Sequence, residues 1–299
     1  MGNTDVLAQR FEDNRRHLYS VAFHLLGSAA DADDAVQSAW LKASGADFAA
    51  VDNLPGWLTT ITARTAIDQL RARSRRIEQS LSDAPELDSS PALATPAADE
   101  QALRSEAVSR ALLVVLDRLS PAQRVAFVLH DVFDVPFEQI GTVLDRSPDA
   151  AKKLASRARA RLQAAPAEQP RRRAEHLEIV SAFLAASRGG DIATLLELLA
   201  PDVVRRVDPV LIPAGVPTEM RGAGDVATET RHFTRRARAG AVLLIDGAPG
   251  IAIAPAGRLL ALLRIGIGDD GRIHTIDIAG DPERLHNATL QLPETVEPR

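Results

Sequence analysis

The stretch VPFEQIGTVLDRSPDAAKKLASRARAR, residues 135–161, constrains the fold more than any other part of the chain. Apolar side chains in residues 137–144 recur at helical spacing, which predicts a short helix with one apolar face. Asp145–Arg146 then predicts a tight turn. Ser147 followed by Pro148 is typical of the start of a second helix, because serine caps helix N-termini and proline fits the first helical position. The stretch therefore predicts a helix-turn-helix.

Cations cover much of the predicted second helix. Leu154, Ala158 and Leu162 lie four residues apart, so we expect them to be buried together. Such a helix suits the major groove of DNA, where cations meet phosphates and longer side chains reach base edges. A solvated basic helix on an ordinary helical domain is the alternative interpretation. The polar side chains on the remaining surface are Lys152, Lys153, Ser156, Arg157, Arg159 and Arg161.

Length and composition exclude several classes of protein. A chain of 299 residues predicts two or three domains, and the absence of cysteine excludes disulfides and thiolate metal sites. No apolar run approaches the roughly 18 residues that span a bilayer. The N-terminus MGNTDVLAQRFEDNRRHLYS is charged and lacks the apolar core of a secretion signal. We therefore expect a cytoplasmic protein with no membrane partner.

Charge is distributed unevenly along the chain. The net charge of −5 opposes DNA binding when it is taken over the whole chain. Residues 107–173, however, hold 12 Lys and Arg against 7 Asp and Glu, whereas residues 81–106 hold 1 against 6. This segregation indicates that the basic segment has an anionic partner.

The chain divides into helical, linker and mixed segments. The helical segments carry apolar residues at helical spacing, and the linkers are rich in Pro, Ser, Asp and Ala. In the last segment a helix breaks at Gly189–Gly190, and strand-like runs follow, with a hairpin signal at Asp269–Gly271, so an α+β domain is expected. The predicted segments are a helical domain at 1–79, a flexible acidic linker at 80–106, the helix-turn-helix domain at 107–165, a linker at 166–173 and the α+β domain at 174–292.

Two segments of the chain, one similar to region two and a later one similar to region four, resemble a bacterial RNA polymerase sigma factor of the extracytoplasmic-function (ECF) group. LSPAQRVAFVLHDVFDVPFEQIGTVLDRSPDAAKKLASRARARL resembles sigma region four, and HLLGSAADADDAVQSAWLKA with LPGWLTTITARTAIDQLRARSRR resembles region two. The final segment is similar to the SnoaL/NTF2-like fold. The resemblance implies two all-α helical domains followed by an α+β cone-shaped domain. It also implies core RNA polymerase and promoter DNA as partners.

The resemblance further implies which residues bind DNA. Trp57, Thr59, Thr60 and Thr62, with Arg64, correspond to the region that holds the unpaired minus-ten strand, although Trp57 suits the core better than a stacking platform. The recognition helix would enter the major groove at the minus-thirty-five element, with Lys152, Lys153 and Arg157 near the bases. The implied DNA-binding residues are Arg64, Arg71, Arg73, Arg75, Arg76, Arg124, Ser147, Lys152, Lys153, Ser156, Arg157, Arg159 and Arg161.

An acidic helix start implies the polymerase contact. Asp31, Asp33, Asp34 and Gln37 resemble the surface that docks on the clamp of the polymerase, where short carboxylates meet arginines. Simple capping of the helix remains an equal alternative for Asp31.

The C-terminal segment leaves its own role open. Relatives of the SnoaL-like fold use a pocket for acid–base chemistry, but His274 and Asp277 lie three residues apart and so point to opposite faces of a strand. Some sigma factors with this appendage carry a DGGGK signature, and VDPVLIPAG stands in the comparable place here. We expect regulation in cis, with no enzyme activity, cofactor or metal, and leave open an unknown small ligand. The polar candidates are Asp208, Arg221, His232, Asp246, His274 and Asp277.

Two rival functions remain. A ligand-responsive helix-turn-helix transcription regulator would sense a small molecule through the C-terminal domain, and would bind a duplex operator alone, usually as a dimer. An enzyme of the cyclase or isomerase type with a DNA-binding head would need catalytic turnover in the last domain.

Overall fold

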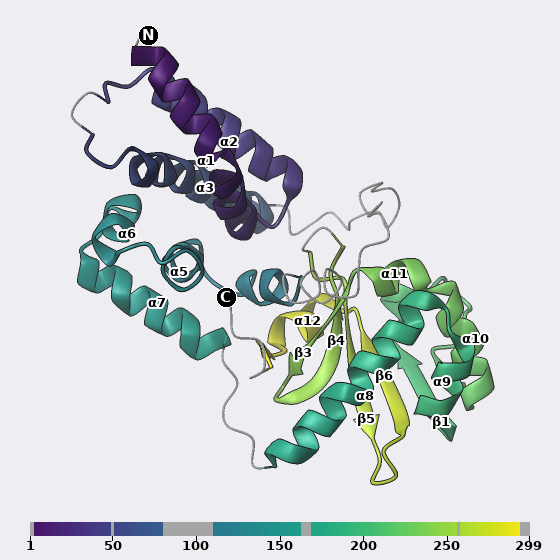
Figure 1. Ribbon diagram of the computed structural model, residues 1–299. Coiled ribbons are helices and arrows are strands. Elements are labelled where there is room, and N and C mark those ends of the chain that lie inside the picture. Colours follow the sequence, from purple (N-terminus) through teal and green to yellow (C-terminus); the bar gives the residue numbers. More distant parts are fainter. Residues whose placement is uncertain (1–2, 49–50, 80–109, 163–168, 256–257, 294–299) are drawn as a thin grey trace. The chain divides into compact units, whose positions relative to one another are not determined.

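The computed structural model describes residues 3–48, 51–79, 110–162, 169–255 and 258–293, without the side chains of 3–5 and 73–79. The chain forms two compact units (Figure 1). The described residues up to 79 and Leu119–Ala160 belong to unit 1. Residues 110–118 and the chain from Arg161 onward belong to unit 2. The predicted acidic linker at 80–106 lies outside the described residues.

Three helices form the first half of unit 1: α1 (Asn3–Leu26), α2 (Ala29–Ser44) and α3 (Leu54–Gln79). The Ser28 hydroxyl caps α2 by accepting a hydrogen bond from the Asp31 backbone N–H at 3.3 Å. One face of each helix is apolar, and these faces pack together, which produces the all-α architecture expected for this segment. Side chains with 1% exposure or less include Leu7, Leu18, Leu25, Ala35, Ala39, Leu58 and Ile67.

The second half of unit 1 contains α5 (Pro121–Phe127), the π-helix η1 (Val128–Val132), α6 (Phe137–Leu144) and α7 (Pro148–Leu162). Asp145 ends α6 in the left-handed conformation, with φ of 54°. The predicted helix-turn-helix is therefore confirmed as α6, a tight turn and α7.

The buried seam of α7 differs from the one expected. Ala151, Ala155, Ala158 and Leu162 are at most 1% exposed, whereas Leu154 is only half-buried. Spacings of four, three and four residues follow the helical repeat of 3.6 more closely than spacings of four alone. The small side chains at these positions allow α7 to lie close to its neighbours.

Unit 2 is built on a seven-stranded sheet with the order β2-β1-β6-β5-β4-β3-β7. Strand β1 pairs in parallel with β6, and every other neighbouring pair is antiparallel. The predicted hairpin joins β5 to β6 through Asp269–Gly271, where Gly271 takes a φ of 73°. The strands are β1 (Leu199–Val207), β2 (Glu219–Arg221), β3 (Gly240–Ile245), β4 (Ala248–Ile253), β5 (Ala261–Ile267), β6 (Ile273–Ala279) and β7 (Leu290–Gln291).

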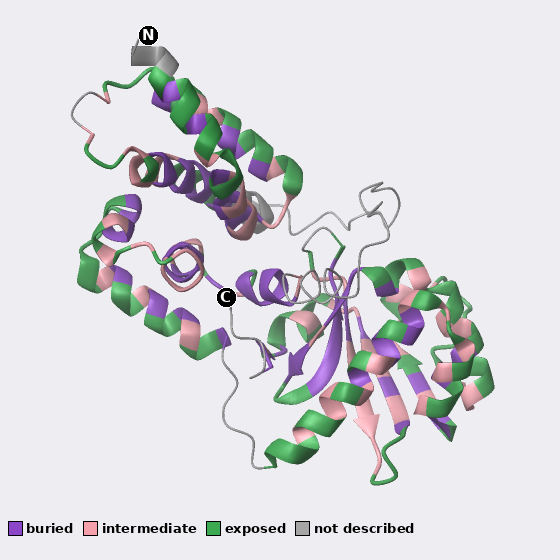
Figure 2. Ribbon diagram, in the orientation of Figure 1, coloured by how far each residue is buried: buried purple, intermediate pink, exposed green. Residues whose placement is uncertain are grey.

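Helices pack on the sheet and enclose an apolar core (Figures 1 and 2). Gly190 ends α8 in the left-handed conformation, at the break that the sequence predicts, and Asp191 caps α9. Helix α8 starts at Pro170, so the last four residues of the predicted 166–173 linker are helical. The elements are α8 (Pro170–Gly189), α9 (Ile192–Leu198), the 3-10 helix η2 (Pro209–Leu211), α10 (Ala223–His232), α11 (Thr234–Arg238) and α12 (Pro282–Asn287).

The α+β architecture expected for the C-terminal segment is confirmed. Within the described part of the chain, no helix is both long and apolar enough to cross a membrane.

Candidate nucleic-acid interface

Four polar side chains form one exposed face on α7. Lys152, Lys153, Ser156 and Arg157 occupy positions i, i+1, i+4 and i+5, so they lie on adjacent rows of the helix. All four are exposed, as is Arg161 in the last turn. We call the four residues the α7 face. It presents three cations and a hydroxyl on a helix held by its buried opposite side.

Two other candidates on this helix already have structural roles. The exposed Ser147 hydroxyl accepts a hydrogen bond from the Ala150 backbone N–H at 3.3 Å and so caps α7. Arg159 is half-buried, and its Nε donates to the Asp131 carboxylate on η1. The Asp131 Oδ2 atom is buried. Arg159 therefore fixes α7 against η1 in this arrangement.

Arg124 does not lie on the surface where a phosphate contact requires it. The residue is 5% exposed, and its Nη1 donates to the Leu25 backbone oxygen at 2.9 Å. Leu25 is in the last turn of α1, whose terminal carbonyls lack helical partners. The guanidinium therefore joins the two halves of unit 1.

The arginines predicted to bind DNA on α3 differ in their surroundings. Arg64 is exposed, but its Nη2 donates to the Thr142 backbone oxygen at 2.6 Å and lies 3.7 Å from Asp145 Oδ1. Arg71 is exposed, with Nη1 3.8 Å from Asp68 Oδ1. The side chains of Arg73, Arg75 and Arg76 lie outside the described residues, although their backbone continues α3. Arg64 is thus engaged by the turn of the helix-turn-helix.

The threonines of α3 face inward. Thr59 and Thr62 are 5% and 0% exposed, and their hydroxyls donate to backbone oxygens four residues earlier. Thr60, which is half-buried, makes the same type of bond to Gly56. Trp57 is also half-buried. This arrangement gives Thr59 and Thr62 packing roles in α3.

Two of the four polymerase-docking candidates line one side of a groove between α1 and α2. Asp33, Asp34 and Gln37 are exposed, whereas Asp31 is half-buried near the Ser28 cap. Asp33 and Gln37 border a groove of about 520 Å³. Burial, reinforced by the charge of Asp33, raises the pKa of Tyr19. Sequence reasoning did not find the other groove residues, which are Ala8, Phe11, Glu12, Arg15, Val36 and Trp40.

Comparisons with known proteins connect these features. The Sigma-70 region 2 family matches residues 10–76, which contain α2 and most of α3. The Sigma-70, region 4 family matches residues 109–162, which contain the helix-turn-helix and the α7 face. A full-length alignment covers 98% of this chain and 99% of the probable ECF RNA polymerase sigma factor SigI of Mycobacterium tuberculosis, at 29% identity. The chain belongs to the ECF RNA polymerase sigma factors.

A second relative is more similar over a shorter length. The ECF RNA polymerase sigma factor SigJ of Mycobacterium tuberculosis is 44% identical over 204 residues, which cover 64% of this chain and 62% of SigJ. The crystal structure of SigJ aligns with 93% of this sigma factor and 97% of that chain, at 32% identity and a TM-score of 0.44. A SnoaL-like protein of unknown function from Burkholderia thailandensis aligns with 36% of the sigma factor and 95% of its own chain, at 20% identity and a TM-score of 0.29.

The six polar candidates of the C-terminal domain do not line the apolar cavity between its helices and the sheet. Asp208 accepts backbone hydrogen bonds from Gly280 and Asp281 at 2.9 and 3.0 Å, and it pairs with Arg284. Partial burial of the carboxyl opposes ionisation, but these bonds outweigh it and lower the pKa of Asp208. Asp208 therefore anchors the β6–α12 connection.

The remaining polar candidates are spread over the domain surface. Asp246 forms the β3–β4 turn and pairs with Arg264 at 2.8 Å. His274 contacts Asp270 at 3.0 Å, and Arg221 contacts Glu219 at 2.8 Å. His232 is exposed in the last turn of α10, and Asp277 is half-buried on β6. Asp246, His274 and Arg221 thus pair with separate charged partners.

Two contacts link the region-four match to the C-terminal domain within unit 2. The Arg118 guanidinium donates to the Leu285 and His286 backbone oxygens at 2.6 and 3.4 Å. Both oxygens belong to α12. At the other end of the match, the Leu292 N–H donates to the Leu162 backbone oxygen at 2.9 Å. Neither bond could be predicted from local sequence patterns, because the partners are far apart along the chain.

Proposed function

We propose that this sigma factor binds core RNA polymerase, recognises the minus-ten and minus-thirty-five promoter elements, and starts transcription under control of its C-terminal domain. The observation that carries the proposal is the exposed α7 face on the region-four helix-turn-helix. Three cations and a hydroxyl on one face match the phosphates and base edges of a major groove. The place of action is then the cytoplasm, where the polymerase transcribes.

The α7 face is the first choice for reading the minus-thirty-five element. Lys152, Lys153 and Arg157 extend from a rigid helix, so small rotations bring them to base edges or phosphates. Arg161 continues the positive surface by one more turn. Arg124 and Arg159 hold internal contacts and are assigned here to positioning the helix.

Arg64 requires an exchange of partners to serve the minus-ten element. Its bond to the Thr142 oxygen must break before a DNA phosphate accepts the same N–H. The guanidinium is exposed, so this exchange costs little desolvation. We assign Arg71 to the same DNA path because it lies two helical turns further along α3.

The groove between α1 and α2 is proposed as the polymerase-docking surface. Asp33 and Asp34 supply exposed carboxylates in the first two turns of α2, and Gln37 follows one turn later. Phe11 and Trp40 also line the groove, and their rings pack edge to face with centroids 5.1 Å apart. A rim of charge around an aromatic base suits a basic protein helix.

The C-terminal domain is proposed to act on region four through Arg118. Its bonds to α12 tie residues at the start of the region-four match to the last helix of the domain. A change in the domain that moves α12 therefore moves this attachment. No chemistry is assigned to the domain, because its polar candidates hold structural bonds at separate places.

Run-off transcription tests the α7 assignment. Full-length Lys152→Ala with Lys153→Ala should lower promoter-specific transcripts by about tenfold or more, with unchanged binding to core polymerase. Arg171→Ala with Arg172→Ala removes the same charge from exposed positions of α8 and should leave transcription unchanged. Unaltered promoter output from the α7 variant would overturn the assignment. Failure of the wild-type chain to bind core polymerase would favour a ligand-responsive regulator.

A single substitution tests regulation in cis. Arg118→Met should change promoter output by at least about fivefold, the lower end of typical coupling between sites. Arg258→Met replaces an exposed arginine of the same domain and should have no effect. Equal output from the wild type and the Arg118 variant would exclude regulation through α12.

A further inference from the structure

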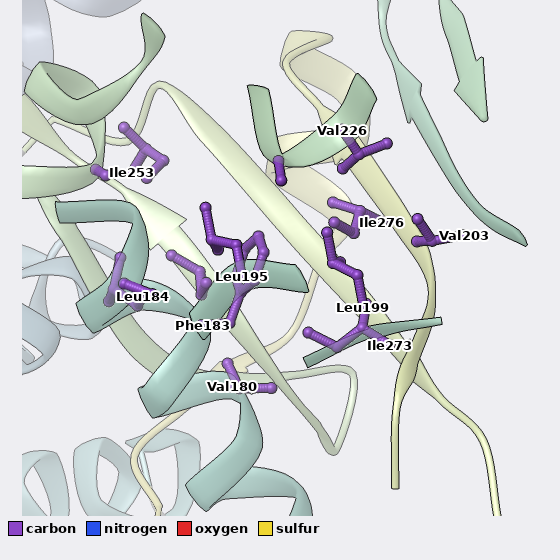
Figure 3. Packing of buried hydrophobic residues seen from close by; sticks show 14 of the residues in the cluster. Val180, Phe183, Leu184, Leu195, Leu199, Val203, Val226, Ile253, Ile273 and Ile276 are labelled. Atoms are coloured by element: carbon purple, nitrogen blue, oxygen red, sulfur yellow. The ribbon is translucent and has the colours of Figure 1, made fainter. Parts of the chain in front are cut away.

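The C-terminal domain contains a cavity between its helices and the sheet. Its volume is about 120 Å³, and its walls are formed by α8, α10 and strands β1, β4, β5 and β6. Figure 3 shows Phe183 and Leu184 of α8 on the side that faces the strands carrying Ile253 and Ile276. The volume is several times the roughly 10–15 Å³ that one water requires, so it holds a molecule of roughly ten non-hydrogen atoms.

An arginine lines this apolar cavity. Side chains alternate along a strand, so Arg205 shares its face of β1 with Val203 and Val207. Its side chain is 5% exposed and binds Glu229 of α10 with two nitrogens, one of them at 2.8 Å from Nε to Oε2. The third nitrogen, Nη1, is buried and has no hydrogen-bond partner among the described residues.

The other polar groups along the wall already have partners or reach solvent. The Ser187 and Thr230 hydroxyls each donate at 2.7 Å to the backbone oxygen four residues earlier in their own helices. Arg236 is exposed and lies 5.3 Å from the centre of the Phe233 ring, which is 39% exposed. These two exposed residues place the mouth of the cavity at the α10–α11 junction. Arg205 also lines the cavity, and its Nη1 is a buried donor.

Charge and burial together select a class of ligand. A buried N–H without an acceptor is unfavourable, so an oxygen placed beside Nη1 gains a charge-assisted hydrogen bond. Glu229 already balances the charge of Arg205, so a second anion would meet that carboxylate at close range. Most of the remaining wall is apolar. Pockets of this type orient their ligand through a few polar groups on an apolar surface.

We propose that the cavity binds a small, neutral, largely apolar molecule, such as a ketone, ester or lactone, whose oxygen accepts a hydrogen bond from Arg205 Nη1. The molecule enters between Phe233 and Arg236. This site requires only the fold of unit 2, so it stands or falls separately from the promoter function.

Three probes of equal size test the ligand class. Acetophenone, cumene and benzoate each have nine non-hydrogen atoms and differ in carrying a neutral acceptor, no acceptor or a negative charge. Saturation-transfer NMR with the full-length protein measures their dissociation constants. Acetophenone should bind about tenfold or more tightly than cumene, which corresponds to one hydrogen bond to a charged donor, and benzoate should bind more weakly than acetophenone.

Paired substitutions separate the hydrogen bond from the fold. Arg205→Met with Glu229→Gln removes both charges together, since removal of one partner would leave the other charge unpaired. This variant should bind acetophenone and cumene equally. Arg206→Met with Glu219→Gln makes the same change at an exposed pair on the opposite face of β1 and should keep the preference. Retained preference in the Arg205 variant would overturn the proposed donor.

A filled cavity provides the second control. Ala261 is 5% exposed and lines the cavity from β5, so Ala261→Leu should weaken acetophenone binding at least about tenfold. A circular dichroism spectrum identical to that of the wild type shows that the variant is folded. Equal binding of acetophenone and cumene by the wild type, tighter binding of benzoate, or binding of none of the probes would each contradict the proposal.

Discussion

Two arginines, one in each unit of this sigma factor, occupy opposite environments. Arg157 stands on the exposed α7 face, whereas Arg205 is buried in a cavity wall and balanced by Glu229. An exposed cation binds phosphates at little cost in desolvation, and salt weakens that binding. A buried cation depends on its partner and discriminates between ligands by hydrogen bonding. Under the two proposals, the same residue type thus provides affinity at the α7 face and selectivity in the cavity.

The largest expected effect is a loss of local stability when the buried arginine, but not the exposed one, is replaced by alanine. Arg205→Ala leaves the Glu229 carboxylate, whose side chain is 23% exposed, without its cation, and should lower the local unfolding free energy by about 3 kcal/mol. Arg157→Ala should change it by less than about 0.5 kcal/mol. Hydrogen exchange of the β1 and α10 amides measures the first value, and exchange of α7 the second. Equal protection in the two variants would show that burial does not distinguish the arginines.

The next largest effect concerns the close packing between α6 and the turn that leads into α7. A Cβ at Gly141 would lie 2.7 Å from the Arg146 backbone oxygen, so Gly141→Ala should destabilise the helix-turn-helix by about 1–2 kcal/mol. A Cβ at Gly189 of α8 would meet no atom within 4 Å, so Gly189→Ala should be neutral or stabilising. Thermal unfolding followed by circular dichroism compares the two variants. A stable Gly141 variant would mean that the turn adjusts freely.

The salt dependence of promoter binding should also distinguish exposed from buried arginines, although the expected change in free energy is smaller. Arg157→Ala should weaken promoter binding by the polymerase–sigma complex by about 1 kcal/mol and reduce the log–log salt slope by about 0.9. Arg205→Met with Glu229→Gln should leave that slope unchanged. Fluorescence anisotropy at several salt concentrations measures both slopes. An unchanged slope for Arg157→Ala would remove it from the set of phosphate contacts.

The smallest expected effect is a change at acidic pH in the stability that Asp208 contributes. Hydrogen bonds and Arg284, acting against burial, lower the pKa of Asp208, so its stabilising contribution is complete above the ordinary value of about 3.9. That contribution is lost as the pH falls through the lower pKa of the folded state. Asp208→Asn should therefore differ in stability from the wild type at neutral pH, and the difference should shrink below about pH 3.9. Exchange of amides near Gly280, measured against pH, would show a constant difference if Asp208 were not an anchor.

Local chemistry made much of the fold predictable. The Ser147–Pro148 start of α7, the Gly190 end of α8 and the Asp269–Gly271 hairpin depend on residues within one turn of each other. The parallel pairing of β1 with β6 had no such signal, because about 70 residues separate the Cα partners Val204 and Thr275.

Exposed candidate residues could be predicted from the sequence more readily than buried ones, whose partners lie far away along the chain. The cations of the α7 face could be assigned from helical spacing alone. Arg124 could not, because its partner Leu25 is 99 positions away in the sequence. Arg205 gave a partial signal, since it stands between Val203 and Val207 on an alternating strand, but nothing indicated Glu229.

The bonds at the two ends of region four affect how the C-terminal domain can be removed. Residues 110–118 and Leu162 group with that domain, while Leu119–Ala160 between them belong to unit 1. Truncation at Pro170 would delete the partners of both Arg118 and Leu162. The apolar residues 111–116, at most 7% exposed in the whole chain, belong to the unit that would lose most of its residues. A shortened chain would therefore combine release from regulation with a new tendency to aggregate.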